Sequence, residues 1–490
     1  MRASGILMHI SSLPSNYGIG TLGQEAYNFV DFLKKSGQTY WQILPICPTG
    51  FGDSPYQTFS SYAGNPYFID LDFLIDEGLL KKEECSSINW GDYSTSVDYK
   101  RMYDNRFDVL KKAYKRFIKS VPDDFEQFCK RESYWLCDYA LFMSIKTQTG
   151  KIWSKWDDEL KFRDEKAIKD FKSKNSDDVM FYKVIQYLFF SQWHKLKEYA
   201  NKNGIQIIGD IPIYVASDSV DVWVNPELFL LNEDNEPTYV SGCPPDSFSK
   251  DGQLWGNPIY DWNKMKEDDY AWWIKRLKYV SEIYDITRID HFRGFDSYYT
   301  IDANAKTARK GVWVKGPGIE FFNSVKKELG SLNIIAEDLG FLTPSVHRLL
   351  KRTGFPGMKV LQFAFDSRED SDYLPHNYPK NTVVYTGTHD NDTIIGWMQT
   401  AKKQDVKFAI DYLRLNQDEG YNWGMMKGAW ASVANTVIVT MQDLQGLDSK
   451  ARMNIPSTVG DNWKWRAARG SMSNTLAKKI NRCMKIYKRV

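Results

Sequence analysis

The chain has 490 residues, of which 42% are apolar and 26% are charged, and its formal net charge is +2. This ordinary globular balance excludes a disordered chain, and the near-neutral charge gives no support to a nucleic-acid binder or an anionic-membrane binder. The sequence contains no run of about 18 apolar residues and no secretory core, so we expect neither a transmembrane helix nor a signal peptide. We therefore predict a cytoplasmic protein without nucleic-acid or membrane partners.

Cysteine and histidine are too scattered to indicate a metal site or a disulfide scaffold. The six cysteines include no Cys-x-x-Cys pair, and the six histidines include no His-Glu-x-x-His. These spacings are the usual signs of zinc or redox chemistry in a sequence. We expect no cofactor and no metal, although a calcium ion held by loop oxygens stays open.

Eight short apolar runs are typical of buried parallel strands. In chain order they are Gly5–His9, Tyr40–Pro45, Ile205–Ile211, Ile286–Asp290, Asn333–Glu337, Lys359–Phe365, Thr382–Tyr385 and Thr436–Met441. Helical patterns lie between many of them, such as Gln24–Ser36 and the segment from Thr343-Pro344 to Gly354. Eight strands that alternate with helices predict an α/β fold of the TIM (β/α)8 barrel type, with a doubly wound open sheet as the alternative.

Long segments separate some of these strands. A bare barrel needs about 250 residues, so we expect one barrel domain over 1–490 with insertions at about 48–200 and 212–264, after strands two and three. The first insertion begins with a loop over 48–65, rich in Gly, Ser, Pro and aromatic residues, and continues with a charged, helical pattern over 105–199. The second is rich in Pro, Asn, Asp and Trp.

A glycine motif near the N-terminus suggests a dinucleotide-binding loop. Gly18, Gly20 and Gly23 match Gly-x-Gly-x-x-Gly, and a predicted helix follows. In a dinucleotide fold the glycines start directly after the strand, whereas here residues 10–17 intervene. The next strand also lacks the acidic residue expected at its end. We therefore interpret the motif as a turn that leads into the first barrel helix.

Acidic residues stand at or just after the ends of three predicted strands. Asp290 closes the fourth strand, Glu337 closes the fifth, and Asp390 follows the seventh. The carboxyl ends of barrel strands open onto one face, where active sites lie. We therefore expect these three carboxylates to converge around one cleft.

Converging carboxylates beside aromatic loops suit glycoside chemistry, in which one carboxylate attacks the anomeric carbon and a protonated one gives its proton to the leaving oxygen. Arg288 lies two residues before Asp290 and points to the same side of the strand, so we expect it to keep Asp290 ionised. Crowding of anions around Glu337 is expected to raise its pKa. Taken singly, a strand-end Asp usually caps a helix, and a lone histidine such as His389 is usually a satisfied core group.

At these residues the sequence resembles the 4-α-glucanotransferases of glycoside hydrolase family 77, the amylomaltases or disproportionating enzymes. The resemblance extends from about Gly5 to Arg466 and rests on motifs in the family's order. They are Ser54-Pro55-Tyr56, Gly209–Val215, Pro244-Pro245-Asp246, Gly252–Pro258, Arg288–Gly294, Ala336–Gly340, Gly387–Asn391, Arg452–Pro456 and Asn462-Trp463.

The resemblance implies a retaining transfer of α-1,4-glucan segments between malto-oligosaccharides, through a covalent glucosyl-enzyme. It implies Asp290 as the nucleophile, Glu337 as the acid/base and Asp390 as the transition-state stabiliser. It further implies substrate-binding residues, which are Tyr56, Asp210, Trp255, Arg288, His389 and Asn462.

The sequence departs from the family pattern in loops on the acceptor side. Ser247 follows Pro-Pro-Asp where Tyr or Ala is common, and Ser457 and Asp461 stand where Gly is common. Two other classes stay open at this point. One is an ordinary α-glucan hydrolase on the same barrel, and the other is a glycan-binding protein without catalysis.

Overall fold

The main sheet of the protein is a ring of eight parallel strands. The computed structural model describes residues 2–245, 249–340, 342–366, 368 and 371–490. The sheet order is β10-β11-β12-β1-β2-β3-β6-β9. The strands are β1 (Ala3–Leu7), β2 (Tyr40–Gln42), β3 (Gln206–Pro212), β6 (Ile286–Asp290), β9 (Ile334–Ala336), β10 (Gly357–Val360), β11 (Thr382–Tyr385) and β12 (Thr436–Thr440).

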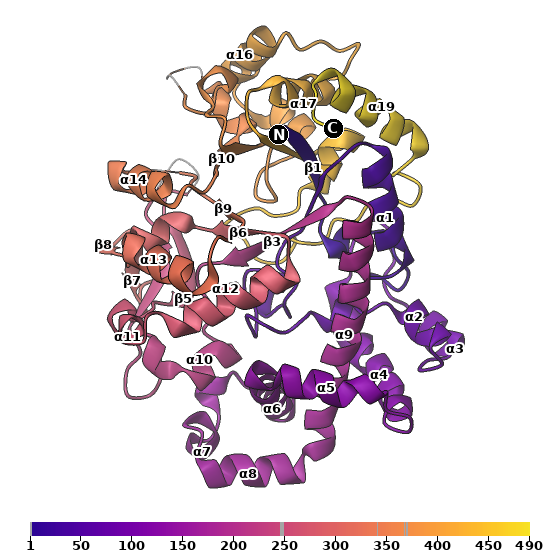
Figure 1. Ribbon diagram of the computed structural model, residues 1–490, viewed down its shortest axis with the longest axis vertical. Coiled ribbons are helices and arrows are strands. Elements are labelled where there is room, and N and C mark those ends of the chain that lie inside the picture. The colour runs from indigo at the N-terminus through magenta and orange to yellow at the C-terminus, as the bar shows by residue number, and fades with distance from the viewer. Residues whose placement is uncertain (1, 246–248, 341, 367, 369–370) are drawn as a thin grey trace.

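Followed around the sheet from β1, this spatial order is also the order of the chain, and the first strand pairs with the last. A doubly wound sheet would instead reverse its direction partway. The prediction of a TIM barrel is thus confirmed, and the open-sheet alternative is wrong (Figure 1).

Two hydrogen bonds join the ring where the sheet order begins and ends. The Ala336 N–H donates to the Pro356 carbonyl at 3.0 Å, next to the start of β10. The Met358 N–H donates at 2.5 Å to the carboxylate Oδ1 of Asp338 rather than to a backbone carbonyl. A side chain therefore completes the ladder between β9 and β10, directly after Glu337.

The predicted strands overlap the observed ones, but the sixth is wrong over most of its length. The strand β10 ends at Val360, and Leu361–Phe365 form a short 3-10 helix. In this helix Gln362 turns its amide toward the loop after β11 and donates to the Asp392 carbonyl at 2.8 Å. A short apolar run cannot distinguish a strand from a buried helical turn, which explains the error.

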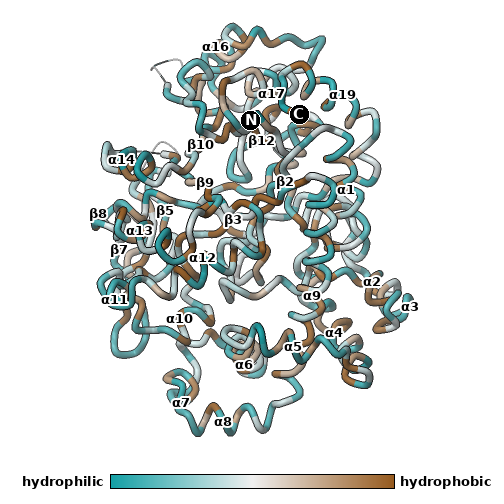
Figure 2. Tube along the Cα trace, viewed as in Figure 1, coloured by the Kyte–Doolittle hydropathy of each residue, from teal (hydrophilic) through white to brown (hydrophobic). Residues whose placement is uncertain are grey.

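Apolar side chains fill the interior of the barrel, and Figure 2 shows hydrophobic residues along central strands such as β3 and β9. A buried cluster contributes to this interior from six of the eight strands: Leu7, Ile208, Ile335, Met358, Val360, Val383, Tyr385 and Ile438. The Tyr385 hydroxyl reaches across to Gln42 and donates to its Oε1 at 2.8 Å. A packed interior of this kind supports the strand ends above it rather than forming a pore.

Helices connect the strands around the outside. They are α1 (Gln24–Lys35), α9 (Ser176–Lys202), α12 (Ala271–Ile283), α13 (Gly318–Leu329), α14 (Pro344–Thr353), α15 (Ile394–Thr400), α16 (Lys403–Leu413), α17 (Tyr421–Ala431), α18 (Met441–Gln445) and α19 (Asn474–Ile486). The α1 helix matches its prediction within one residue, and α14 ends as expected before Gly354, which has a φ of +76° that a side chain would strain.

The first insertion is helical, as predicted, and Figure 1 shows much of it below the barrel. Its helices are α2 (Leu71–Asp76), α3 (Lys82–Ser86), α4 (Tyr99–Phe117), α5 (Asp123–Arg131), α6 (Ser133–Thr149), α7 (Asp158–Lys161) and α8 (Glu165–Lys174). The long helix α9 then returns the chain to β3.

A second, antiparallel sheet was not predicted. Its order is β5-β4-β7-β8, with β4 (Tyr239–Cys243), β5 (Gln253–Pro258), β7 (Ser297–Asp302) and β8 (Gly311–Lys315). The strands β4 and β5 belong to the second insertion, together with the helix α10 (Val220–Val224), and α11 (Trp262–Glu267) follows β5. The strands β7 and β8 follow β6 and form a third insertion, which pairs with the second through β4 and β7.

The glycine motif forms a turn, in keeping with its interpretation. A side chain on Gly20 would collide with the Ile10 carbonyl, and one on Gly23 would meet the carboxylate of Asp70 at 2.0 Å. The N-terminus of α1 is therefore packed against an acidic side chain, which would repel a phosphate. Glycine is needed at positions 20 and 23 because a side chain would not fit there, and nucleotide binding is not required to explain it.

The two ends of the chain lie close together and are joined through Arg489 (Figure 1). This side chain is fully buried, and its guanidinium donates to five backbone carbonyls. The acceptors are those of Ala3, Trp430, Ser432, Ala434 and Asn435, at 2.8 to 3.4 Å. One side chain thus joins the C-terminus to β1 and to the entry into β12. No helix in the described part of the chain is long and apolar enough to span a membrane.

Candidate active site

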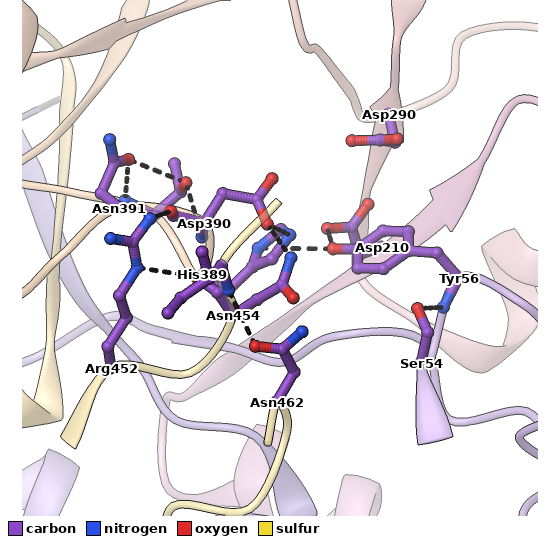
Figure 3. A network of polar contacts seen from close by, with 12 residues as sticks. Ser54, Tyr56, Asp210, Asp290, His389, Asp390, Asn391, Arg452, Asn454 and Asn462 are labelled. Atoms are coloured by element: carbon purple, nitrogen blue, oxygen red, sulfur yellow. Dashed lines mark hydrogen bonds and ion pairs between the residues drawn. The ribbon is translucent and has the colours of Figure 1, made fainter. Parts of the chain in front are cut away.

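The predicted site residues gather at the carboxyl ends of four barrel strands. Asp210 lies near the end of β3, and Asp290 is the last residue of β6. Glu337 follows β9 directly, and Asp390 lies in the loop after β11. Figure 3 shows Asp210 and Asp290 facing the loop that carries Asp390. Elements that are distant in sequence therefore meet at one face of the barrel.

A buried ion pair lies at the base of the site. The Nη1 of Arg288 donates to both carboxylate oxygens of Asp210, at 2.8 and 2.6 Å. The Nη2 of the same guanidinium lies 2.9 Å from the Oδ1 of Asp290. The side chain of Asp210 is fully buried, whereas 32% of the Asp290 side chain is exposed. Of these two carboxylates, Asp290 is therefore the one that a substrate can reach.

Glu337 is held by the backbone around it. Its Oε2 accepts the N–H of His291 at 2.7 Å, and its Oε1 accepts the N–H of Leu339 at 2.7 Å. Burial, followed by the negative charge of Asp290, raises the pKa of Glu337 to about 8. The expected direction is correct, but burial contributes more than anion crowding. Glu337 thus holds a proton at neutral pH.

Asp290 has a raised pKa as well, because burial outweighs the opposing effect of Arg288. We expect Arg288 to keep Asp290 ionised, and the guanidinium does lower this pKa, although burial raises it by more. Two neighbouring carboxyls resist being ionised together. Since Arg288 contacts Asp290 directly, we assign the shared proton to Glu337 and the negative charge to Asp290.

Tyr56 and His389 form a second layer beside the ion pair. The Tyr56 hydroxyl donates to Asp210 Oδ2 at 2.8 Å, and its ring stacks on that of His389 with centroids 5.0 Å apart. His389 is buried, and its Nε2 lies 3.4 Å from Asp390 Oδ1. The Asp390 side chain is 46% exposed. Tyr56 therefore lies between the Asp210–Arg288 ion pair and the loop that carries His389 and Asp390.

Two further residues of the site come from the loop over 452–463. Asn454 donates from its amide to Asp390 Oδ1 at 2.6 Å, and Arg452 donates to the Asp390 carbonyl at 2.6 Å (Figure 3). The Asn454 N–H also donates to the His389 carbonyl at 3.1 Å. We did not single out either residue from the sequence, although both lie in a motif of the resemblance. Nothing in their spacing indicated a contact with a carboxylate.

Trp255 and Asn462 lie at the edges of this cluster. The Trp255 ring, on β5, meets the His291 ring edge-on with centroids 4.8 Å apart. Asn462 uses its amide within its own loop, accepting from the Ile455 N–H and donating to the carbonyl and hydroxyl of Thr458, each at 3.0 Å. Asn462 therefore shapes the loop in this structure and does not touch the carboxylates.

Two of the loop residues that differ from the family pattern, Ser457 and Asp461, can be described in the structure. Ser457 has a φ of +64°, in the left-handed region that favours glycine, and Asp461 forms an ion pair with Lys464 at 2.8 Å. Ser247, and Asp246 of the Pro-Pro-Asp motif, lie outside the described residues.

Chemically, the site offers a protonated carboxyl, a carboxylate on a guanidinium and a third carboxylate opposite them. This set can attack a carbon, protonate a leaving oxygen and stabilise positive charge. Among the described residues, no group of three or more His, Cys, Asp or Glu side chains is placed to hold a metal ion.

Comparison with known proteins identifies relatives over the whole chain. A family model described as 4-alpha-glucanotransferase matches residues 8–472. The 4-alpha-glucanotransferase of Clostridium butyricum is 52% identical over 485 residues, covering 98% of this chain and 100% of its own. That of Streptococcus pneumoniae is 49% identical over 494 residues, covering 100% of this chain and 98% of its own.

Among solved structures, an amylomaltase from Streptococcus agalactiae in complex with acarbose has a TM-score of 0.98 and 45% identity, with 100% of both chains covered. Fold, site and sequence therefore agree, and the chain belongs to the 4-alpha-glucanotransferase family, whose enzymes transfer glycosyl groups of α-1,4-glucans.

Proposed function

We propose that the chain transfers an α-1,4-glucan segment from a donor malto-oligosaccharide to the 4-hydroxyl of an acceptor glucan or glucose, with retention at the anomeric carbon. The observation that carries this proposal is the contrast between Glu337 and Asp290. The pKa of Glu337 is raised to about 8, while its neighbour lies 2.9 Å from the guanidinium of Arg288. A retaining mechanism needs this pairing of a proton donor with an ionised nucleophile.

In the first step an oxygen of Asp290 forms a bond to the anomeric carbon as the glycosidic C–O bond breaks. Glu337 gives its proton to the departing 4-oxygen, and a covalent glucosyl-enzyme remains. In the second step Glu337, now ionised, takes the proton of an acceptor 4-hydroxyl, whose oxygen displaces Asp290. Since the second step reverses the first, one residue serves as acid and base. We expect the two carboxyl groups to lie about 5–5.5 Å apart.

The other predicted residues surround this pair in two different roles. Asp390 stabilises the positive charge that develops on the ring, and His389 binds the sugar beside it. Asp210 and Arg288 are too buried to offer much surface, so we assign them to orienting Tyr56 and Asp290 beneath the sugar.

Trp255 lines the outer part of the cleft, where an aromatic ring can stack on glucose, and the loop of Asn462 covers the acceptor side. Transfer requires that a sugar reach the glucosyl-enzyme before water does. The loops that exclude water and position the acceptor therefore decide between transfer and hydrolysis.

The test is the product profile of the purified protein with maltotriose alone. Glucose accumulating with maltopentaose and longer chains, at constant total reducing ends, is the expected result. Rising reducing ends with only glucose and maltose as products would instead make the protein a hydrolase. No turnover, with binding retained, would favour a non-catalytic glycan-binding protein.

The variant Asp290→Asn is the second test, because it keeps the size of the side chain and removes its negative charge. We expect it to bind malto-oligosaccharide and to lose turnover. Equal turnover in this variant would mean that another residue is the nucleophile. We also expect acarbose, which is bound in the Streptococcus agalactiae structure, to compete with maltotriose.

A further inference from the structure

Asp443 is a buried carboxylate to which no role has been given so far. It lies next to the loop between β11 and α15, which carries His389 and Asp390. It lies in the short helix α18, just beyond the last barrel strand, and is 1% exposed. Its Oδ1 accepts the N–H of Ile394 at 2.7 Å, and its Oδ2 accepts the hydroxyl of Thr386 at 2.8 Å. The Asp443 side chain therefore binds two positions in the segment that connects β11 to α15.

These two positions are the ends of the loop that carries the third carboxylate. Thr386 directly follows β11, and Ile394 is the first residue of α15. The seven residues between them, 387–393, include His389 and Asp390. Asp443 thus joins the loop where it leaves the barrel to the point where it enters a helix, and so fixes the span that the loop must bridge.

Asp443 is itself held firmly from the other side. Its N–H donates to Thr440 Oγ1 at 3.1 Å, at the end of β12, and its carbonyl accepts the amide of Asn422 at 2.8 Å. The anchor therefore belongs to the barrel wall and to α17, not to the loop. Within the loop, Asp392 makes separate contacts, accepting from Gln362 at its carbonyl and from Ser449 at its carboxylate.

A buried carboxylate at this position is costly for the fold. Burial raises the pKa of Asp443 to about 6, even though three hydrogen-bond donors lower it. An apolar side chain of similar volume would avoid the loss of hydration. The advantage of the carboxylate lies in its geometry, because two acceptor oxygens at a fixed separation can hold two donors at once.

We propose that Asp443 is a positioning residue that sets the place of Asp390 and His389 by tying together the two ends of their loop. This inference rests on the role proposed above for Asp390. A displacement of about 1 Å in a catalytic group can cost about 100-fold in rate. Loss of the tie is therefore expected to lower kcat far more than it changes KM.

The experiment compares Asp443→Ala with a matched control, Asp70→Ala. Asp70 is 5% exposed and makes the same pair of bonds, accepting the Phe73 N–H at 3.0 Å and the Thr21 hydroxyl at 2.5 Å. It caps α2, in the first insertion, and plays no part in the site. Both variants lose equivalent bonds, so both are expected to melt at a lower temperature.

At a temperature where both variants are folded, Asp443→Ala is expected to lower kcat about 10- to 100-fold with KM within about threefold of the parent. Asp70→Ala is expected to leave kcat unchanged. Hydrogen exchange should rise in the peptide over 386–394 in the first variant alone. A kcat for Asp443→Ala within twofold of the parent, or an equal loss in Asp70→Ala, would overturn the proposal.

Two milder variants keep the test decisive if Asp443→Ala does not fold. Asp443→Asn can accept the Ile394 N–H and donate to the Thr386 hydroxyl, so it is expected to restore most of kcat. Thr386→Val removes one bond of the two and is expected to lower kcat severalfold at unchanged KM. An unchanged kcat in Thr386→Val, or a kcat in Asp443→Asn more than tenfold below that of the parent, would contradict the proposal.

Asp390→Asn separates this inference from the function on which it rests. If Asp390→Asn keeps full turnover, the role of the third carboxylate is wrong, whatever Asp443 does. If Asp390→Asn collapses turnover while Asp443→Ala leaves it intact, only the positioning role fails.

Discussion

Asp210 and Arg288 are paired directly across the parallel ladder between β3 and β6, and both side chains are buried. The Nη1 of the arginine spans both oxygens of the aspartate, which turns the Nη2 toward Asp290, two residues further along the same strand. The register of the barrel therefore sets the orientation of the proposed nucleophile, through a hydrogen-bonded pair that no loop movement can shift.

Breaking this pair should lower the stability of the fold. We expect Asp210→Asn to lower the free energy of unfolding by about 3–5 kcal/mol. The variant leaves the buried guanidinium of Arg288 with only one of its two carboxylate partners, Asp290. Urea unfolding measures the change. Asp104→Asn, which breaks the exposed pair with Lys100, is the control and should cost less than about 1 kcal/mol. Equal costs in the two variants would contradict the interpretation.

The activity of the enzyme should fall on the alkaline side. In the proposed mechanism Glu337 must be protonated for the first step. Its pKa is raised to about 8, so kcat/KM for maltotriose should decline as the pH rises through about 8. Glu337→Gln should lose turnover on maltotriose and retain a first step on an α-maltosyl fluoride, whose leaving group needs no proton. A profile still flat at pH 9 would exclude Glu337 as the acid.

The same raised pKa predicts a change of stability with pH. The folded protein binds the Glu337 proton more tightly than the unfolded chain does, so this residue stabilises the fold fully below its ordinary pKa of 4.5. That contribution should decline as the pH rises from about 4.5 to about 8. Glu337→Gln cannot titrate, so the melting temperature of this variant should decline less over that range than that of the parent.

Trp255 should favour transfer over hydrolysis. We expect Trp255→Ala to raise the ratio of released reducing ends to transfer products on maltotetraose, because the ring beside His291 shields the cleft from water. Trp313→Ala is a suitable control, since Trp313 lies on β8 of the same sheet, packed against Arg293. If both variants keep the parent ratio, Trp255 has no part in excluding water.

Removal of Arg489 should destabilise the whole barrel rather than the C-terminal helix alone. Loss of the guanidinium would remove its hydrogen bonds to five backbone carbonyls, of which those of Trp430 and Asn435 also accept from Arg2 and from the Ala3 N–H. We expect Arg489→Ala to lower the midpoint of thermal unfolding by several degrees, in a single transition. Two separate transitions would mean that α19 unfolds independently of the barrel.

Much of the site could be predicted because barrel geometry makes strand ends converge. Asp290 and Glu337 were assigned from their places at the ends of apolar runs, and the structure puts both at one face of the ring. Their pKa values could not be predicted equally well. Burial dominates both shifts, and burial depends on the packing of segments that are remote in sequence.

The contacts from loops were the least predictable. Asn454 binds Asp390 across 64 positions of sequence, and no periodic pattern indicates such a contact. The strands β7 and β8 were missed for a related reason. In β8 the apolar residues Val312, Trp313 and Val314 are all exposed, so no alternation of apolar and polar residues marks a strand there. The partner of β7 in the sheet is β4, which precedes β6 in the chain.

The second sheet has a consequence for how this enzyme can be altered. Because β4 precedes β6 in the chain, β7 follows it, and the two strands hydrogen-bond to each other, the second and third insertions form one structural unit with β6 between them in the sequence. A chimera that receives only one of these insertions from a relative would have to pair β4 and β7 from different parents, whose contacting side chains differ. Recombination between relatives should therefore tolerate crossover points outside residues 239–315 and reject those that fall within them.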